Sequence, residues 1–222
     1  MRKARRARRV GLTRPAFCLK EAIDRPLAAL TLLVLSPILL GVALAIKVDT
    51  RGPVFYRQQR VGRDGEVFRV FKFRTMIDGA DRIGLGKNVA RNDRRITRVG
   101  AILRRTSIDE VPQLINVALG QMALVGPRPS TVEHAGLYTA HQRRRLEVRP
   151  GITGWAQVNG RNLLSWEERI ERDIWYIDHW TPALDLRIAA RTPRVLLSSE
   201  GLYGAGGVTT DLGAGADSTA PG

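Results

Sequence analysis

The sequence predicts an α+β fold, in which a mostly helical domain with a small antiparallel β element follows an N-terminal apolar helix. Three observations predict it. Residues 27–46 contain no charge, residues 54–59 and 66–73 are rich in β-branched and aromatic side chains on either side of a turn, and several stretches with helical patterns follow. At 222 residues the chain is long enough for one sizeable domain with appendages.

Basic residues are concentrated at the N-terminus. Seven of the first fourteen residues are Lys or Arg and none is acidic, so residues 1–14 are predicted to be a disordered basic arm. The formal net charge of +15 requires an anionic partner, either nucleic acid or a membrane surface. The single cysteine, Cys18, excludes an internal disulfide and fits a reducing compartment.

The uncharged run at residues 27–46 allows three structures. As a straight helix it would be about 30 Å long, which is just enough to cross a bilayer. It could also be a buried core helix, or a re-entrant helix that enters and leaves the membrane on one face. A cleaved signal peptide fits less well, because the run is long and no small-residue cleavage site follows it.

Two observations favour the re-entrant helix, predicted over residues 15–47. Pro37 removes a helical hydrogen bond in the middle of the run, and the Ser36 hydroxyl could bond a carbonyl that the proline frees. Both flanks are also basic, with nine Lys and Arg against two acids in residues 1–25 and eight against three in residues 47–74. A straight crossing would place one basic flank on the wrong side of the membrane. Neither observation decides the question alone, because kinked spanning helices are common.

A β-hairpin is predicted next. Residues 54–59 and 66–73 are joined by a turn signal at residues 62–65. In the second strand Phe68 and Val70 share one face, and Phe71 and Phe73 lie on the other. Residues 81–95 are rich in Gly, Asn, Asp and Arg and are predicted to be a loop.

Helices are predicted at residues 97–105, 109–119, 131–147, 165–179 and 183–199. The fourth begins with Ser165 followed three residues later by Glu168, which is the pattern of a capping box. Residues 48–202 would thus form the catalytic domain. Residues 203–222 are rich in Gly, Ala, Thr and Ser without periodicity and are predicted to be a flexible tail.

The adjacent carboxylates Asp109 and Glu110 are the first candidates for chemistry. Neighbouring acids among arginines suit a site that handles a phosphate ester, because one group can attack or bind metal while cations hold phosphate oxygens. A structural interpretation competes with this one, since Ser107 and Glu110 also fit a capping box. Local sequence alone favours the structural interpretation, but the two can coexist, because a helix N-terminus also attracts phosphate.

Basic residues elsewhere could complete such a site. Arg128 lies between two prolines, which fix the backbone and reduce the entropy lost when its guanidinium is held. Lys72 and Arg74 end the second predicted strand. Their structural alternatives are a salt bridge in a rigid loop for Arg128 and a solvated strand end for Lys72 and Arg74. The three histidines are too scattered for a zinc site, and no nucleotide-binding glycine motif is present.

Together these segments resemble the bacterial sugar transferase family, the monotopic polyprenol-phosphate phosphoglycosyl transferases. The resemblance covers about residues 17–210 and rests on motifs that occur in the family's order. They are the Ser-Pro break in the apolar run and residues 52–58, 71–76, 104–114, 125–129, 149–155 and 157–162. Larger relatives carry additional transmembrane helices ahead of this unit, so the chain resembles the short form.

The resemblance implies a reaction. A phosphosugar would pass from a UDP-sugar donor to polyprenol (undecaprenyl) phosphate, giving polyprenol diphosphate sugar and UMP. This step initiates the assembly of a glycan such as an exopolysaccharide, an O-antigen or a glycoprotein glycan. The implied location is the cytoplasmic face of the bacterial inner membrane, in contact with membrane lipid, and the Ser36-Pro37 break would make the membrane helix re-entrant.

The resemblance also assigns roles to residues. Asp109 would attack the sugar-proximal phosphate, form a covalent phosphosugar intermediate and bind Mg²⁺, while Glu110 assists. Arg104 and Arg128 would bind phosphate, with Lys72 and Arg74 as further substrate-binding candidates. The sugar, the polyprenol length and the oligomeric state, a homodimer included, are left open.

Two other functions remain in view. A nucleic-acid-binding protein is supported only by the charge, since no recognition helix or basic-aromatic platform is present, so no nucleic acid partner is expected. A non-catalytic membrane scaffold would retain the fold, although the intact Asp109-Glu110 pair argues against it. Release of UDP in place of UMP would instead indicate an ordinary glycosyl transferase.

Overall fold

A computed structural model describes residues 14–83, 89–90, 93–197 and 208–209. The predicted basic arm, apart from Arg14, therefore lies outside the described residues, as does most of the predicted tail. Two residues of that tail are described, Val208–Thr209, which form strand β6 and pair antiparallel with β3 (Val89–Ala90). The prediction of a tail without regular structure is wrong at these two positions, because the chain returns to pair with a strand inside the loop predicted at 81–95.

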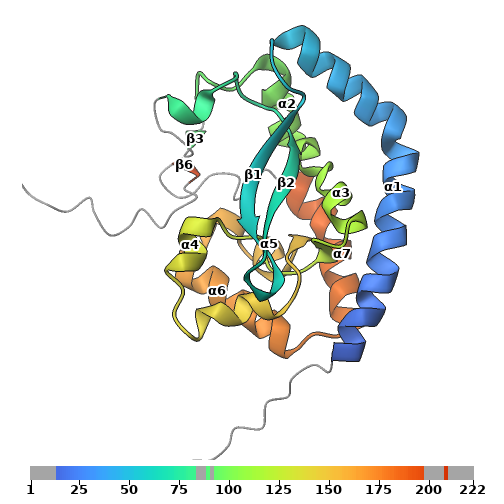
Figure 1. Ribbon diagram of the computed structural model, residues 1–222, viewed down its shortest axis with the longest axis vertical. Helices are drawn as coiled ribbons and strands as arrows, with labels where there is room; N and C mark the ends of the chain where they lie inside the picture. The colour runs from blue at the N-terminus through green and yellow to red at the C-terminus, as the bar shows by residue number, and fades with distance from the viewer. Residues whose placement is uncertain (1–13, 84–88, 91–92, 198–207, 210–222) are drawn as a thin grey trace, which may run out of the picture.

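The apolar run lies within one helix, α1 (Arg14–Asp49), which contains both Pro26 and Pro37. The Ser36 hydroxyl donates a hydrogen bond to the Leu33 carbonyl at 2.7 Å. That carbonyl lies four residues before Pro37 and would otherwise bond the N–H that proline lacks. The predicted role of the Ser36 hydroxyl is confirmed. Figure 1 shows α1 as a continuous curved helix, so a re-entrant path through a membrane stays a prediction.

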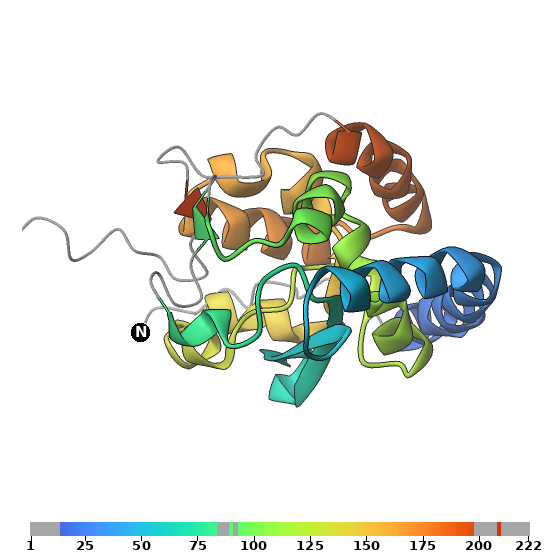
Figure 2. The same cartoon turned by 90° about the horizontal axis from the view of Figure 1, so that it is seen from above.

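α1 lies along one side of the domain, as both views show (Figures 1 and 2). Ala28 on its inner face is fully buried beside Leu114 and Val117 of α3 (Gln113–Ala118), and Ile46 is buried near the other end of the helix. Its other face is apolar and exposed, at Leu19, Ile23, Leu27, Leu30, Leu33, Val34, Ile38, Leu40, Leu44 and Val48. By length and composition, α1 is the one helix among the described residues that could cross a membrane.

The predicted hairpin is confirmed. β1 (Phe55–Val61) and β2 (Val67–Phe73) pair antiparallel in the register Phe55 to Phe73 and Val61 to Val67, with a 3-10 turn at Arg63–Gly65. Asn116 of α3 fixes β2 to that helix. Its carboxamide accepts a hydrogen bond from the Phe71 N–H at 3.0 Å and donates to the Arg69 carbonyl at 2.8 Å. The end of β2 that contains Lys72 is therefore fixed to α3.

A parallel strand pair was not predicted. β4 (Ala123–Val125) and β5 (Gly151–Thr153) lie side by side. β4 leads directly into residues 126–130, which we call the Pro-Arg-Pro loop. Glycine is required where the chains meet, because a Cβ at residue 151 would lie 2.1 Å from the Gly126 nitrogen. Behind this pair a core cluster joins Val125, Val148, Tyr176, Ile177, Trp180, Leu184 and Ile188.

The helices were predicted with mixed success. α2 (Arg98–Thr106), α6 (Trp166–Asp178) and α7 (Pro182–Leu197) match the predictions within one or two residues over the described chain, and the Ser165 to Glu168 capping box is present. The single helix predicted at 131–147 is wrong. It divides into α4 (Val132–Gly136) and a 3-10 segment (Gln142–Glu147), because Thr139 and Gln142 exchange side-chain to backbone hydrogen bonds that end one segment and start the next. Shorter elements complete the described chain: 3-10 turns at Ala80–Arg82 and Arg161–Leu163, and α5 (Trp155–Val158).

Candidate active site

Asp109 and Glu110 lie in a tight 3-10 turn (Ile108–Glu110) between α2 and α3 and do not begin a helix. Ser107 has a left-handed backbone, with φ of 57°, that ends α2 and turns the chain. Its side chain makes no capping hydrogen bond, so the capping-box interpretation is wrong. The helix predicted over 109–119 is confirmed only at α3 (Gln113–Ala118), which begins four residues later. The Glu110 carboxylate is bound by side chains from other elements, and local sequence rules do not register such tertiary bonds.

Two cations hold the Glu110 carboxylate. The Arg128 guanidinium approaches both oxygens, at 2.6 Å and 3.2 Å, and Lys72 Nζ lies 2.8 Å from Oε1. Burial alone would raise the pKa of Glu110, but the charges and hydrogen bonds of Arg128 and Lys72 outweigh it and hold that pKa well below its usual range. Glu110 is therefore ionised and fixed, and it joins the hairpin to the Pro-Arg-Pro loop.

Asp109 differs from its neighbour. Within the part of the chain that the structure describes, its carboxylate makes no hydrogen bond or ion pair. Burial, with the negative charge of Glu110, raises the pKa of Asp109 to about 6, against the opposing charges of Lys72, Arg104 and Arg128. At neutral pH the carboxylate is ionised and has no competing partner, which is the state required of a nucleophile.

Both carboxylates border a cavity of about 980 Å³, which is large enough for a nucleotide sugar. The cavity wall carries the basic side chains Lys72, Arg74, Arg104, Arg128 and Arg161. Arg104 lies in the last turn of α2, and its Nη1 is 3.5 Å from the Thr75 hydroxyl. Arg74 is engaged elsewhere, because its guanidinium donates to the Thr50 and Arg51 carbonyls just after α1. The structure therefore places Lys72, Arg104 and Arg128 about the carboxylates and leaves Arg74 at the edge.

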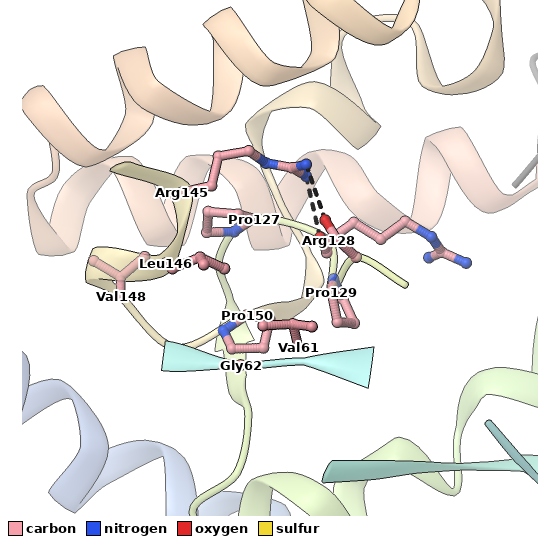
Figure 3. A pocket seen from close by; sticks show the side chains of 10 residues that line it. Val61, Gly62, Pro127, Arg128, Pro129, Arg145, Leu146, Val148 and Pro150 are labelled. Carbon is pink, nitrogen blue, oxygen red and sulfur yellow. Dashed lines mark hydrogen bonds between the residues drawn. The ribbon is translucent and has the colours of Figure 1, made fainter. Parts of the chain in front are cut away.

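The Pro-Arg-Pro loop presents Arg128 to the cavity. Figure 3 shows its side chain extended away from the loop, while Arg145 approaches the loop backbone from the other side. Arg145 is buried and donates to the Arg128 carbonyl at 3.1 Å. It was missed in the sequence because it is one of three consecutive arginines, and nothing local shows which of them faces inward.

Arg161 is a second residue that sequence reasoning missed. Its backbone is left-handed, with φ of 50°, directly after Gly160, and it borders the same cavity. Its pKa is lowered by burial and by the nearby charge of Arg128, while Glu110 and Asp109 oppose that shift. Its guanidinium donates a long hydrogen bond, 3.3 Å, to the Val195 carbonyl. The only signal in the sequence was its place in the motif at residues 157–162.

Residues 15–199 match the family described as bacterial sugar transferase. The chain belongs to the bacterial sugar transferase family. The matched region contains every residue of the site described above.

Several members of the family are similar over most of this chain. A protein named uncharacterized sugar transferase EpsL, from Bacillus subtilis, is 45% identical over 87% of this chain and 94% of its own length. Proteins named UDP-glucose:undecaprenyl-phosphate glucose-1-phosphate transferase are 43% identical in Caulobacter vibrioides and 45% identical in Escherichia coli, over 83% and 78% of this chain. These matches cover 72% of the Caulobacter protein but only 39% of the E. coli protein.

The side chains of the site decide whether it could hold the expected Mg²⁺. Among the described residues no cluster of three or more His, Cys, Asp and Glu side chains could hold a metal alone. Mg²⁺ commonly binds through one or two carboxylates together with substrate phosphates and water. Asp109 offers an unpaired carboxylate on the cavity, whereas the Glu110 oxygens are bound to cations. The residues therefore fit a cation that binds with the substrate.

Proposed function

We propose that this sugar transferase moves a phosphosugar from a UDP-sugar to polyprenol phosphate and releases UMP. The observation that carries the proposal is the pair of unequal carboxylates. Glu110 is held by Arg128 and Lys72, while Asp109 beside it has no partner within the described residues and faces a cavity with basic walls. The names of the Caulobacter and E. coli relatives make UDP-glucose and undecaprenyl phosphate the first substrates to test.

The proposed reaction has two steps. In the first, an Asp109 oxygen attacks the sugar-proximal phosphorus, and the bond from that phosphorus to the bridging oxygen breaks. The electron pair leaves with UMP, and a phosphosugar remains covalently bound to Asp109. In the second, an oxygen of polyprenol phosphate attacks the same phosphorus and releases the Asp109 carboxylate. Two steps let a soluble donor and a lipid acceptor use one site in turn.

The basic residues would bind the substrate and stabilise charge. Arg128 and Arg104 approach the carboxylates from different elements and can hold phosphate oxygens on either side of the attacked phosphorus. Arg161, next to Arg128, can bind the departing nucleotide phosphate. Glu110 orients Arg128 and Lys72, and its negative charge keeps them from pairing with Asp109. Mg²⁺, held by Asp109 and the substrate, would neutralise charge on the diphosphate.

The two faces of α1 indicate how the protein would lie at a membrane. Its exposed apolar face suits the membrane, and its inner face is bound to the domain. We infer that α1 is re-entrant, and that the domain lies on the cytoplasmic face of the inner membrane, where a soluble donor and a lipid acceptor can both reach Asp109.

The deciding experiment identifies the nucleotide product. Detergent-solubilised protein is given UDP-glucose, undecaprenyl phosphate and Mg²⁺, and UMP and UDP are separated by chromatography. We expect UMP from the wild type and none from Asp109→Asn. Glu171→Gln, which removes an exposed carboxylate on α6, is the matched control and should retain activity. UDP as the product would show that a different bond breaks, and equal UMP from Asp109→Asn would exclude the covalent route.

A further inference from the structure

The backbone of the Pro-Arg-Pro loop is held at four successive carbonyls. Each accepts a hydrogen bond, and the donors come from three segments of the chain, because Arg60 and Val61 are neighbours in β1. The donors are the Gly151 N–H to Pro127 at 2.8 Å, Arg145 Nη2 to Arg128 at 3.1 Å, Arg60 Nη1 to Pro129 at 3.3 Å and the Val61 N–H to Ser130 at 2.9 Å. Prolines have no N–H, so this loop can be fixed mainly through its carbonyls. The donors therefore determine where Arg128 lies.

Arg145 is the donor that acts on Arg128 itself. Its guanidinium also donates to the Ser130 hydroxyl at 3.1 Å and to the Tyr138 hydroxyl at 2.5 Å. The Trp166 ring centroid lies 5.3 Å from its Cζ. One planar group thus bonds two points of the loop and packs on an aromatic side chain, which leaves it little freedom.

Asp173 holds Arg145 in turn. Its Oδ2 lies 2.6 Å from Arg145 Nη2, and the two side chains are 2% and 4% exposed. A charge pair buried to this extent gains little net stability over apolar side chains of similar volume, but it fixes geometry. Asp173 lies in α6 and Arg145 in the 3-10 segment before β5. The pair therefore connects the helical part of the domain to the loop.

The two arginines lie on opposite sides of the loop. In Figure 3 the guanidinium of Arg145 meets the loop backbone, and that of Arg128 extends away from it. Arg128 then reaches both oxygens of Glu110. A shift of the Arg128 carbonyl would move the root of this side chain and alter its approach to the carboxylate and to a substrate phosphate.

We propose that Arg145, held by Asp173, is a positioning residue for phosphosugar transfer, because it fixes the Arg128 backbone and so directs the Arg128 guanidinium at the reacting phosphates. This inference rests on the proposed function. Arg145 and Asp173 also border the cavity, but the Arg145 guanidinium bonds the loop, Tyr138 and Asp173 and neither carboxylate of the site, so in this scheme it acts through Arg128. Displacement of a substrate-binding group by about 1 Å can reduce turnover by about 100-fold, so a residue of this kind can control the rate.

The test replaces the buried pair by apolar side chains, as Arg145→Met with Asp173→Leu, so that no buried charge is left unpaired. We expect a thermal unfolding temperature close to that of the wild type and a fall in kcat for UMP release of about 10- to 100-fold. Arg145→Lys is the second variant. It keeps a cation for Asp173 but cannot reach both the Arg128 carbonyl and the Ser130 hydroxyl, so it should lose activity to a similar extent without unfolding.

A matched control connects the same two elements without touching the loop. Arg144 and Asp178 form an ion pair between the same 3-10 segment and α6, with Nη2 2.5 Å from Oδ1. Arg144→Gln with Asp178→Asn removes this link, and kcat should stay within about twofold of the wild type, because exposed pairs contribute little. An equal loss of kcat in this control would assign the effect to α6 packing and overturn the proposal.

The decisive comparison is made in an Arg128→Gln background. If Arg145 acts through Arg128, the Met/Leu substitution should lower kcat by less than about threefold in that background, because coupled residues are not additive. A full additional loss, or wild-type kcat in the Met/Leu variant, would overturn the proposal. UMP binding by calorimetry is measured on the same proteins. If the wild type releases no UMP, the proposed reaction is refuted but the role of Arg145 is not. UMP affinity then tests that role, because the Met/Leu substitution should have little further effect on the affinity in the Arg128→Gln background.

Discussion

Asp109 combines burial with a like-charged neighbour, and both destabilise its ionised form. Burial and Glu110 raise its pKa to about 6, whereas a free aspartate ionises near 3.9. Nearby cations oppose this shift but do not cancel it. The folded protein therefore holds a proton on Asp109 more tightly than the unfolded chain does.

This shift predicts how stability depends on pH. Since the folded pKa is raised, the contribution of Asp109 to stability is fully present below about pH 4 and is lost as the pH rises through 6. Asp109→Asn should therefore be more stable than the wild type at pH 7.5, by about 1–2 kcal/mol after screening by solvent, and no more stable at pH 4. Chemical denaturation in the presence of a chelator at the two pH values measures this. A difference that is the same at both would contradict a raised pKa.

The backbone of Arg161 is strained, because its φ of 50° is left-handed. A left-handed backbone costs a residue other than glycine about 1–2 kcal/mol, and such residues are often found at functional sites. We expect Arg161→Asn to reduce UMP release by at least about tenfold, as the loss of a phosphate-binding cation implies.

The same substitution should leave the free energy of unfolding within about 1 kcal/mol of the wild type. Asparagine tolerates the left-handed conformation, which offsets the loss of one long hydrogen bond to Val195. Thermal unfolding and product analysis on one preparation separate the two effects. A large loss of stability with retained activity would instead make Arg161 a structural residue.

At the scale of elements, Asn116 links α3 to the hairpin by hydrogen bonds, beside the buried contacts of Leu114 and Val117 with β2. It is fully buried, and its carboxamide bonds the Phe71 N–H and the Arg69 carbonyl of β2. Asn116→Ala leaves both backbone groups without this partner, and should lower the free energy of unfolding by about 2–4 kcal/mol. Gln121→Ala is the control, because the exposed Gln121 side chain bonds, among the described residues, only the Asn116 side chain, so its loss should cost less than about 1 kcal/mol. Urea denaturation measures both, and equal losses would refute this role of Asn116.

The elements that could be predicted are those whose pattern is local. The hairpin at 55–73 has alternating side chains and a turn, and α6 has a capping box at Ser165, so both follow from short windows of sequence. β4 and β5 are three residues each and lie far apart in the chain, so no periodicity reveals them. The helix predicted at 109–119 begins only at Gln113, because the left-handed Ser107 is followed by a 3-10 turn. The Glu110 carboxylate of that turn binds Lys72 of β2 and Arg128 of the Pro-Arg-Pro loop.

The residues of the candidate site also divide into those that a local pattern reveals and those that depend on tertiary contacts. Asp109, Glu110 and Arg128 were found because acids beside arginines and an arginine between prolines are visible in the sequence. Arg145 and Arg161 were not, because their importance depends on tertiary contacts, a carbonyl in one case and a neighbouring guanidinium in the other. Arg74 was proposed from its position at a strand end, and its guanidinium is instead bonded to the segment after α1.

At the scale of the whole molecule, both ends of α1 are bound to the same domain. Near its start, Glu21 pairs with Arg63 at 2.6 Å and with Arg149 at 2.7 Å. At its end, the Asp49 carboxylate accepts a hydrogen bond from the Val99 N–H at 3.0 Å. An upright α1 would place Glu21 and Asp49 on opposite sides of the hydrocarbon, because the uncharged run between them is about 30 Å long. Since both ends are bound to one domain, polar groups of that domain would then lie within the hydrocarbon. The packing therefore favours an arrangement in which both ends of α1 stay on one side of the membrane.

This arrangement predicts how introduced cysteines react. In a Cys18→Ala background, Leu19→Cys and Val48→Cys place thiols at two exposed positions near opposite ends of α1, and Leu33→Cys places one on its exposed apolar face near the middle. In inside-out membrane vesicles a membrane-impermeant maleimide should label both end positions, whereas in right-side-out vesicles it should label neither. Position 33 should be protected in both, because the hydrocarbon shields it from an aqueous reagent. If positions 19 and 48 are labelled from opposite sides, α1 crosses the membrane, and the contacts that bind both of its ends to the domain could not persist there.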